Sequence, residues 1–551
     1  MVSRYAPMHF TAKPFRRMNL IEILSEHANF RAEQIALKDC RSGKDRSITF
    51  RHLEERVKLA SKRLVVAGVK KNSRVLIAVS LSIETYVILL ALFRIGAVAV
   101  IADASLGFCT LEKSVTMVKP DAVVFDNRTR FLCMLSAAVK NIRLKIFSDR
   151  IVSQVGRKTD TVPTCTIEDV GSEHPALITF TSGSTGAPKA IVRTHGFLQQ
   201  QQKVIAKSLP PQPHDIELTT LPVFVLSALS QGITAVLPDC NMQKPASIKA
   251  ARIAAQIDRC RINRIIAAPA FLQTLSDFLI DKKITMPALR RIYTGGGPVF
   301  PALLKQMQTV FPNAELTAVY GSTEAEPIAH IDFRSINKKD LARTFSGGGL
   351  LAGKPIAEIE LRIGDAELPP YKIGEILVSG KHVVKTYLDG IGNAETKIEI
   401  GSGKQKKVWH RTGDAGYLDN EGRLWLMGRC SSKISDERGE IYPFQVEAAG
   451  SEVISIKRVT CLQSNGRRIL LVERKHQSFF HEIASAGPKA RKAFLDTIGA
   501  AFGWLQFDEI RVVRAIPVDM RHNSKIQYSQ VLYKLNHKFP WTWGQVIHHP
   551  A

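Results

Sequence analysis

The chain has 551 residues, of which 45% are hydrophobic, and it carries 76 Lys and Arg against 50 Asp and Glu, a formal net charge of +26. A typical domain has roughly 100–200 residues, so we expect three or more folding units. The basic residues are dispersed and form no stripe interleaved with aromatics, which argues against a nucleic-acid groove. A positive field of this size would attract nucleotides, acidic protein partners or anionic membrane surfaces.

The eight cysteines occur singly, without a CxxC pair or the spacing of a disulfide framework. This pattern favours a reducing, cytoplasmic setting and argues against a structural zinc. The longest apolar stretch, residues 85–104, is interrupted by Arg94 and Gly96, so it predicts a buried helix and a buried strand rather than a membrane span. We therefore expect a cytoplasmic protein without a transmembrane segment, and a peripheral association with membranes stays open.

From about residue 19 to residue 340, helical periods alternate with short β-branched runs. Residues 53–69 have the period of an amphipathic helix, whereas "RVLIAVS" at 74–80 and "DAVVFD" at 121–126 have the composition of buried strands. This alternation predicts βαβ units and largely parallel sheets.

Beyond residue 345 the pattern changes to glycine-punctuated strands such as "GEILVSG" and "GRLWLMG", which predict hairpins. The predicted organisation is a large N-terminal domain, residues 1–428, followed by a small α+β domain, residues 429–551. Within the large domain we expect two mainly parallel α/β subdomains and a smaller β-rich one, at about 19–160, 161–344 and 345–428.

The segment "LITFTSGSTGAPKAIVRTH" at 177–195 contains a cluster of small and hydroxyl-bearing residues followed by a lysine. We predict a strand before it, a helix from 195 to 209 after it, and a strand-to-helix turn over Thr181–Lys189. Glycines and hydroxyls suit phosphate oxygens, but Pro188 excludes the ordinary P-loop, whose lysine follows a glycine. Taken alone, the segment is equally compatible with a flexible Ser/Gly linker.

Three further motifs follow in order: "YGSTEAE" (320–326), "HRTGDAGYLDNEGRLWLMGR" (410–429) and "VDMRHNSKI" (518–526). Together with the 177–195 segment and the opening helices and strands, they resemble the adenylate-forming superfamily of acyl-CoA synthetases, luciferases and peptide-synthetase adenylation domains. The resemblance covers nearly the whole chain. Within the superfamily, "PVDMRHNSKI" and "SDERGEIYPFQVE" look most like the β-lactone synthetases of bacterial olefin biosynthesis.

The resemblance implies an α/β fold with a mobile C-terminal domain, and ATP and Mg²⁺ as the groups bound. A carboxylate would attack the α-phosphorus of ATP and give an acyl-adenylate and pyrophosphate. Lys189 would be the mobile counter-charge of a loop that wraps the β- and γ-phosphates. The other residues of that loop are Thr181, Ser182, Gly183, Ser184, Thr185 and Gly186.

By the same resemblance, Glu324 would hold Mg²⁺, because a hard carboxylate suits a hard cation, and Thr323 would donate to the α-phosphate. Asp414 would accept hydrogen bonds from the two ribose hydroxyls, and Arg429 would reach the nucleotide at the domain junction. The remaining residues expected around the nucleotide are Gly295, Gly296, Gly297, Tyr320, Gly321 and Ser322.

Lys525 is the residue that the resemblance places on the small domain, where it would reach the α-phosphate only after that domain closes. Without the resemblance it would be one exposed lysine among many. His195 and Phe224 fall where the superfamily lines its acyl and nucleotide site. A buried histidine and a core phenylalanine explain these two residues equally well.

The acceptor of the activated acyl group is left open by the sequence. In β-lactone formation the substrate's own 3-hydroxyl attacks the carbonyl, so a long-chain 2-alkyl-3-hydroxy acid would need no second substrate. In thioester formation the acceptor would be CoA or an acyl-carrier protein. Ser431 stands at the hinge where Asp or Lys is usual, and the glycine of "DERGEIY" is displaced by one, so the use of CoA is uncertain.

A protein that binds nucleotide without catalysis is the alternative from another class. The charged side chains that adenylation requires are all present, which argues against it. The expected partners are a small acyl substrate and, among proteins, pathway enzymes or an acidic carrier protein.

Overall fold

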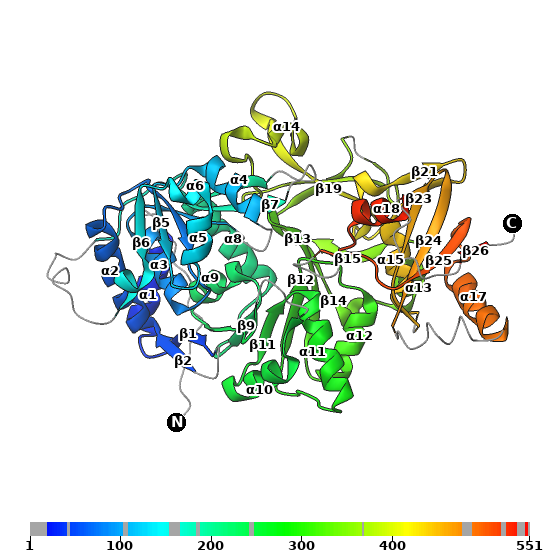
Figure 1. The fold of residues 1–551 in the computed structure, drawn as a ribbon, viewed down its shortest axis with the longest axis horizontal. Helices are drawn as coiled ribbons and strands as arrows, with labels where there is room; N and C mark the ends of the chain where they lie inside the picture. The colour runs from blue at the N-terminus through cyan, green and yellow to red at the C-terminus, as the bar shows by residue number, and fades with distance from the viewer. Residues whose placement is uncertain are drawn as a thin grey trace. The chain divides into compact units, whose positions relative to one another are not determined.

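A computed structural model describes residues 19–40, 45–102, 108–153, 166–182, 188–241, 247–365, 368–453, 455–475, 488–519, 525–536 and 546–548. The chain forms two compact units, Met1–Gln34 with Thr49–Gln200, and Ile35–Ile48 with Gln201–Ala551. Figure 1 labels their helices and strands. Within the part of the chain that is described, no helix is long and apolar enough to cross a membrane.

The first unit is built on one six-stranded sheet in the order β6-β5-β3-β4-β7-β8. Its neighbours are parallel except for β7 and β8, which pair antiparallel. The strands are β3 (Arg74–Ala78), β4 (Val98–Ile101), β5 (Ala122–Phe125), β6 (Leu144–Phe147), β7 (Pro175–Ser182) and β8 (Pro188–Thr194). The helices are α1 (Ile21–Phe30), α2 (Phe50–Val66), α3 (Ile83–Arg94), α4 (Phe108–Val118), α5 (Arg130–Leu135), α6 (Ala137–Lys140) and α7 (Ser148–Val152), and α8 (His195–Ser208) follows β8.

The apolar stretch 85–104 of this unit has the predicted structure. Helix α3 is buried on nearly all sides, and β4 follows it in the middle of the sheet. A helix that is apolar all round can only be stable inside a protein or a membrane, and here the surrounding helices and sheet bury it. The α/β class expected from the alternating pattern is confirmed.

The second unit contains a fourteen-stranded sheet of which one half, from β13 to β1, is parallel. Helices α10, α11 and α12 pack against this part through one apolar cluster that includes Ile257, Phe271, Leu304, Ile265 and Ile292. The strands of the parallel part are β1 (Ile35–Asp39), β9 (Ile216–Thr219), β10 (Thr234–Leu237), β11 (Arg264–Ala267), β12 (Arg291–Gly295) and β13 (Glu315–Ser322), with β2 (Arg46–Thr49) beside β1. The helices are α9 (Pro222–Ser230), α10 (Ala250–Cys260), α11 (Pro269–Asp281) and α12 (Pro301–Val310).

From β13 onward the same sheet continues with antiparallel pairs, as the glycine-punctuated hairpins predicted. Its strands are β14 (Ala325–Asp332), β15 (Leu350–Pro355), β16 (Glu360–Ile363), β17 (Gly374–Ser379), β18 (Lys397–Ile400), β19 (Lys407–Leu418) and β20 (Leu424–Arg429). Helices α13 (Lys338–Phe345) and α14 (Asn393–Thr396) belong to this part.

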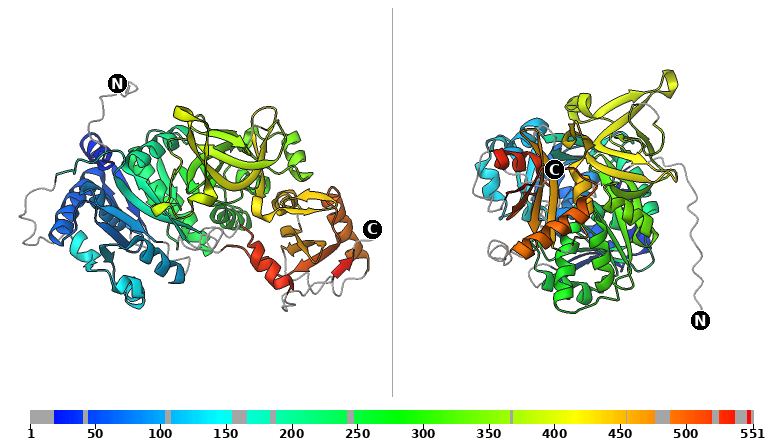
Figure 2. Two further views of the ribbon diagram at one scale, coloured as in Figure 1. Left: turned by 90° about the horizontal axis from the view of Figure 1, so that it is seen from above. Right: turned by 90° about the vertical axis from the view of Figure 1, so that its right-hand side faces the viewer.

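The C-terminal part has the expected α+β character. Its four-stranded sheet consists of β23 (Ile456–Ser464), β24 (Arg467–Arg474), β25 (Glu509–Val513) and β26 (Val546–His548), preceded by the hairpin β21 (Ile434–Asp436) and β22 (Gly439–Ile441). Its helices are α15 (Pro443–Gly450), α17 (Pro488–Phe502) and α18 (Tyr528–Asn536). Figure 2 shows α17 in orange beside the brown strands, where Phe494, Ile498 and Phe502 join the apolar cluster of β23 and β24.

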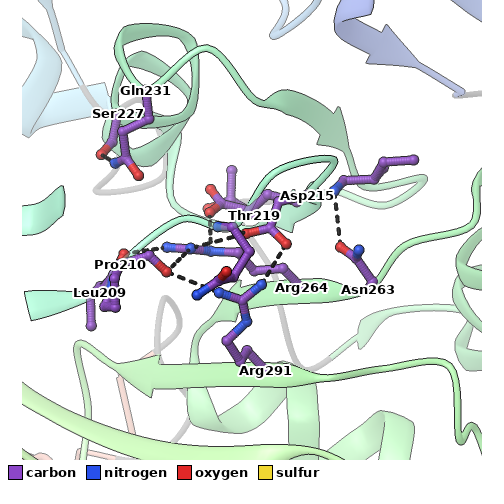
Figure 3. A network of polar contacts seen from close by, with 12 residues as sticks. Leu209, Pro210, Asp215, Thr219, Ser227, Gln231, Asn263, Arg264 and Arg291 are labelled. Atoms are coloured by element: carbon purple, nitrogen blue, oxygen red, sulfur yellow. Dashed lines mark hydrogen bonds and ion pairs between the residues drawn. The ribbon is translucent and has the colours of Figure 1, made fainter. Parts of the chain in front are cut away.

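A buried ionic network fixes the starts of β9, β11 and β12 (Figure 3). The guanidinium of Arg264 is fully buried, lies 2.7 Å from Glu217 and donates to the carbonyls of Leu209 and Pro210. Arg291 contacts Asp215 at 2.6 Å. Because these contacts hold the amino ends of the parallel strands, they leave the carboxyl ends, where α/β sheets bind ligands, for the site.

Candidate active site

The carboxyl end of β13 and the strand β19, which lies further along the same sheet, bring Tyr320 and Asp414 together. The hydroxyl of Tyr320 donates to one oxygen of Asp414 at 2.8 Å. The other oxygen lies 3.2 Å from a guanidinium nitrogen of Arg429, which stands opposite Asp414 in the antiparallel pairing of β19 and β20. Three residues from two of the quoted motifs therefore form one polar cluster.

The chemical state of this cluster follows from its surroundings. Burial raises the pKa of the Tyr320 hydroxyl well above its ordinary value, and the negative charge of Asp414 raises it further, so Tyr320 keeps its proton and is a donor. The Arg429 side chain is more than half exposed, at 56%, and the Asp414 side chain is 24% exposed. Both charged groups are thus accessible to a ligand.

Glycines allow the backbone of β12 and β13 to approach other strands closely. A Cβ atom on Gly295 would lie 2.5 Å from the carbonyl oxygen of Val319, and one on Gly321 would lie 2.9 Å from that of Ala325. Gly296 has a φ of +78°, which side-chain-bearing residues rarely adopt. Gly295, Gly296 and Gly297 therefore end β12 in a turn that a larger residue would disrupt.

Thr323 and Glu324 form the tip of the hairpin between β13 and β14, since Ser322 pairs with Ala325. Thr323 is exposed and Glu324 is half-buried. The carboxylate of Glu324 accepts a hydrogen bond from the hydroxyl of Tyr387 at 2.9 Å. The "GSTEAE" motif thus presents its carboxylate at a turn.

The electrostatic environment keeps Glu324 ionised. Burial raises the pKa of this carboxyl and is the largest single effect, but the positive charge of His410, the hydrogen bond from Tyr387 and the other lowering contacts together outweigh it. Lys397 contributes in the same direction, and the net effect is a lowered pKa. An ionised carboxylate is what a Mg²⁺ ligand requires.

The segment predicted to wrap phosphate lies in the first unit, and its expected local structure is wrong. Residues 181–189 do not lead from a strand into a helix; they connect β7 to the antiparallel strand β8, with Thr181 opposite Lys189. The β-branched Ile191 and Val192 extend the chain as a strand, and the helix then begins at His195, as predicted.

Within this hairpin the structure describes only part of the predicted phosphate site. Lys189 is buried in β8, and Thr181 is half-buried near the end of β7. Ser182 ends β7. Gly183, Ser184, Thr185 and Gly186 lie outside the described residues, so their predicted contacts with phosphate stay a prediction.

His195 and Phe224 have surroundings typical of core residues. The imidazole of His195 is fully buried, accepts a hydrogen bond from the backbone nitrogen of Leu20 at 3.1 Å and packs edge-on against Phe93. Burial lowers its pKa to about 4, and nearby His174 adds to the shift. Phe224 packs in α9 within an apolar cluster that contains Tyr293. A role for either residue in a pocket remains a prediction.

Lys525 lies in the C-terminal part, where its backbone is paired with that of Asp519. Its backbone nitrogen donates to the carboxylate of Asp519 at 3.0 Å, and the backbone nitrogen of Asp519 donates back to the carbonyl of Lys525 at 2.9 Å. The Lys525 side chain is exposed. Three residues further on, Tyr528 donates to Glu447 at 2.6 Å, which anchors the start of α18.

The residues of the second unit fit a nucleotide with Mg²⁺. Thr294 and Ser322, at the ends of β12 and β13, each have a buried hydroxyl oxygen without a hydrogen-bond partner among the described residues. Buried polar groups without partners are uncommon, so two of them beside glycine turns indicate a site for a polar ligand. The single carboxylate of Glu324 suits Mg²⁺, which proteins commonly bind through one or two carboxylates together with phosphates.

Tyr387, Lys397 and His410 surround Glu324 but were not singled out from the sequence. His410 lies inside a quoted motif, but no role could be predicted for a histidine before "RTGD" without knowing which residues contact it. Tyr387 and Lys397 lie in a segment without a motif, 63 and 73 residues after Glu324 in the chain. Only the folded sheet brings them together.

The fold and the cluster of Tyr320, Asp414 and Arg429 define an adenylate-forming enzyme, an AMP-forming ligase or synthetase. Residues 24–388 match the family described as "AMP-binding enzyme", and the chain belongs to this family. It is 27% identical to an olefin beta-lactone synthetase of Xanthomonas campestris pv. campestris, over 92% of this chain and 96% of that protein.

A 2-succinylbenzoate–CoA ligase of Bacillus subtilis is 28% identical over 77% of this chain and 81% of its own length. Among solved structures, the o-succinylbenzoate CoA synthetase of Bacillus subtilis in complex with ATP and magnesium ion has a TM-score of 0.73 at 22% identity, covering 93% of this chain and 99% of that one. This likeness confirms the fold. The relatives therefore include enzymes with two different acyl acceptors.

Proposed function

We propose that this enzyme converts a long-chain 2-alkyl-3-hydroxy fatty acid to a β-lactone in two steps that use ATP. The observation that carries the proposal is the extent of the similarity to the olefin beta-lactone synthetase, which continues through the C-terminal part to 92% of the chain. The similarity to the CoA ligase covers 77%. The C-terminal part contains Ser431 at the hinge and the two segments, "SDERGEIYPFQVE" and "PVDMRHNSKI", that resemble β-lactone synthetases.

In the first step the substrate carboxylate attacks the α-phosphorus of ATP, a bond to the bridging oxygen breaks, and pyrophosphate leaves. Asp414 would bind the ribose, and Arg429 would contact the nucleotide. Glu324 would hold Mg²⁺, which supplies positive charge to the phosphates. Thr181–Lys189, with Thr323, would bind the phosphate oxygens.

Lys525 would complete this site when the C-terminal part closes. Its side chain is exposed, its backbone is hydrogen-bonded to Asp519, and Tyr528 three residues further on is bonded to Glu447. A flexible cation on a backbone held in this way can be delivered to the α-phosphate. Catalysis would then depend on closure.

In the second step the substrate's 3-hydroxyl oxygen attacks the activated carbonyl. The new carbon–oxygen bond closes a four-membered ring, the bond from the carbonyl carbon to the phosphate oxygen breaks, AMP leaves, and the hydroxyl proton is lost to solvent. Because the hydroxyl and the carbonyl belong to one molecule, the effective concentration of the hydroxyl can be on the order of 10⁵–10⁸ M. No thiol acceptor is needed.

A ligase that transfers the acyl group to CoA or to an acyl-carrier protein is the second candidate. The similarity to a 2-succinylbenzoate–CoA ligase favours it. The use of CoA as the acceptor is disfavoured by Ser431, which stands at the hinge where Asp or Lys is usual in the superfamily. The β21–β22 hairpin that follows the hinge is held by ion pairs from Asp436 to Arg438 and Arg468. An acidic carrier protein would be attracted by the net charge of +26.

A matched pair of substrates separates the two candidates. The purified chain is incubated with Mg-ATP and either a long-chain 2-alkyl-3-hydroxy acid or the same acid without the 3-hydroxyl, each with and without CoA. We expect sustained AMP release without CoA from the hydroxy acid alone, with a β-lactone as the product. AMP release that requires CoA for both acids, with acyl-CoA as the product, would contradict lactone formation.

A further inference from the structure

We propose that Tyr387 is a positioning residue for Mg²⁺: its hydroxyl holds the Glu324 carboxylate in the orientation in which it binds the metal. This inference rests on the proposed function, because it requires Glu324 to be the Mg²⁺ ligand. It adds a residue from outside the sequence motifs to the site.

The backbone joins the segment that carries Tyr387 to the hairpin tip that carries Glu324. The backbone nitrogen of Val384 donates to the carbonyl oxygen of Glu324 at 2.8 Å, and Val383 forms an antiparallel bridge with Ala325. Tyr387 lies three residues after Val384 in the chain. The two side chains are therefore held at a fixed separation by main-chain bonds.

A second set of contacts fixes Tyr387 itself. The side-chain oxygen of Asn393 accepts from the backbone nitrogen of Tyr387 at 3.0 Å, while its amide nitrogen donates to Thr386 at 2.8 Å. The ammonium of Lys397 lies 5.0 Å from the centre of the Tyr387 ring, within the range of a cation–π interaction. The tyrosine side chain is buried, at 3% exposed.

Lys397 is in turn held by the neighbouring strand and segment. It donates to the carbonyl of Val384, and its nitrogen lies 3.1 Å from Nδ1 of His410 on β19. The segment from Val384 to Tyr387 thus contacts Glu324 twice, through the backbone of Val384 and through the side chain of Tyr387. The carbonyl of Val384 also accepts a hydrogen bond from Lys397. The group forms one connected network around the carboxylate.

The hydroxyl of Tyr387 is a donor to Glu324 because it does not ionise. Burial raises its pKa above the ordinary value, and the charge of Glu324 raises it further. An ionised carboxylate has about four lone-pair positions, so one hydrogen bond orients the group without using its capacity to bind a metal. Outer hydrogen bonds of this kind orient metal-binding carboxylates, and their loss typically weakens metal affinity roughly 10- to 100-fold.

The test compares the parent with Tyr387→Phe, which removes the hydroxyl and keeps the ring. Tyr417→Phe is the matched control, because the Tyr417 hydroxyl is also buried and donates to a carbonyl, that of Gly348, at 2.7 Å. ATP binding to the full-length chain is measured by calorimetry over a series of Mg²⁺ concentrations, together with the melting temperature. The expected result is a rise of roughly 10-fold or more in the Mg²⁺ concentration for half-maximal ATP binding in Tyr387→Phe alone.

A double-mutant cycle with Glu324→Gln tests whether Tyr387 acts through Glu324. In the Glu324→Gln background, Tyr387→Phe should change the Mg²⁺ requirement by less than about twofold, since coupled residues are not additive. An equal Mg²⁺ requirement in Tyr387→Phe and the parent would overturn the inference. So would a large drop in melting temperature, because the hydroxyl would then support the fold. Absence of Mg²⁺-dependent ATP binding in the parent would instead contradict the proposed function on which the inference rests.

Discussion

The hydroxyl of Tyr320 donates to the carboxylate of Asp414 across a distance of 2.8 Å, and this bond connects β13, where the parallel sheet ends, to the antiparallel strand β19. The hydrogen bond holds a carboxylate that is also paired with Arg429. Asp414 is therefore a held acceptor beside an exposed cation, which suits the recognition of a nucleotide that carries both hydroxyls and phosphates.

Asp414→Asn should weaken ATP binding. The substitution keeps the shape of the side chain but removes the charge, and hydrogen bonds to charged groups contribute about 1.5–3 kcal/mol each. We expect the dissociation constant of ATP to rise at least roughly 10-fold. Calorimetry provides the measurement, with Asp389→Asn as a control for an exposed carboxylate. Unchanged ATP affinity in Asp414→Asn would remove Asp414 from the nucleotide site.

Lys525→Ala should abolish acyl-adenylate formation and leave ATP binding nearly unchanged. The side chain is exposed in the structure, so the fold does not depend on it. Substrate-dependent release of pyrophosphate from ATP measures the reaction, and Lys381→Ala controls for the loss of one exposed positive charge. Equal pyrophosphate release by Lys525→Ala and the parent would show that another group acts on the α-phosphate.

Arg264→Met should destabilise the second unit. Removal of this guanidinium leaves the buried carboxylate of Glu217 without its ion-pair partner, while Asp215 keeps its pair with Arg291 (Figure 3). Breaking a buried ion pair in this way costs on the order of 3–5 kcal/mol. Arg259→Met, which breaks the exposed pair with Asp45, should cost less than about 1 kcal/mol. Denaturant unfolding compares the two variants, and equal losses would contradict a structural role for the network.

Glu447→Gln should change how stability depends on pH. Burial raises the pKa of this carboxyl from 4.5 to about 7, even though Tyr528 and Thr460 donate to it. The folded state therefore binds more protons than the unfolded state between these values, and the contribution of Glu447 to stability falls as the pH rises from 4.5 to 7. The full loss is up to about 3 kcal/mol.

The variant lacks this loss, so its stability relative to the parent should increase between pH 5 and pH 8. Denaturant unfolding at the two pH values measures the difference, and Glu452→Gln, a more exposed carboxylate of the same part, is the control. If the stability difference between parent and Glu447→Gln is the same at both pH values, Glu447 does not titrate in this range.

Much of the fold could be predicted because its signals are local. The apolar run at 85–104 and the hairpins after residue 345 each follow from patterns within a few residues. The prediction of a strand-to-helix turn at 181–189 was wrong because a second strand, Pro188–Thr194, follows the polar stretch directly. This strand pairs with β7, and the sequence pattern alone does not show that pairing.

The candidate site could be predicted only where its residues lie in motifs. Tyr320, Glu324, Asp414 and Arg429 were singled out in this way, and their roles toward a nucleotide stay predictions. The network around Glu324 was missed because Tyr387 is brought to it by a backbone bridge between Val383 and Ala325, which no local pattern encodes. Long-range contacts of this kind depend on the register of the whole sheet.

The transfer of oxygen from substrate to nucleotide tests adenylate formation most directly. The purified enzyme is incubated with Mg-ATP and a long-chain 2-alkyl-3-hydroxy acid labelled with ¹⁸O in its carboxyl group, without CoA, and the products are analysed by mass spectrometry. The account predicts AMP that carries one ¹⁸O atom in its phosphate, unlabelled pyrophosphate and a β-lactone that keeps one ¹⁸O atom in its carbonyl. AMP without ¹⁸O, or ¹⁸O in inorganic phosphate together with ADP, would contradict the formation of an acyl-adenylate.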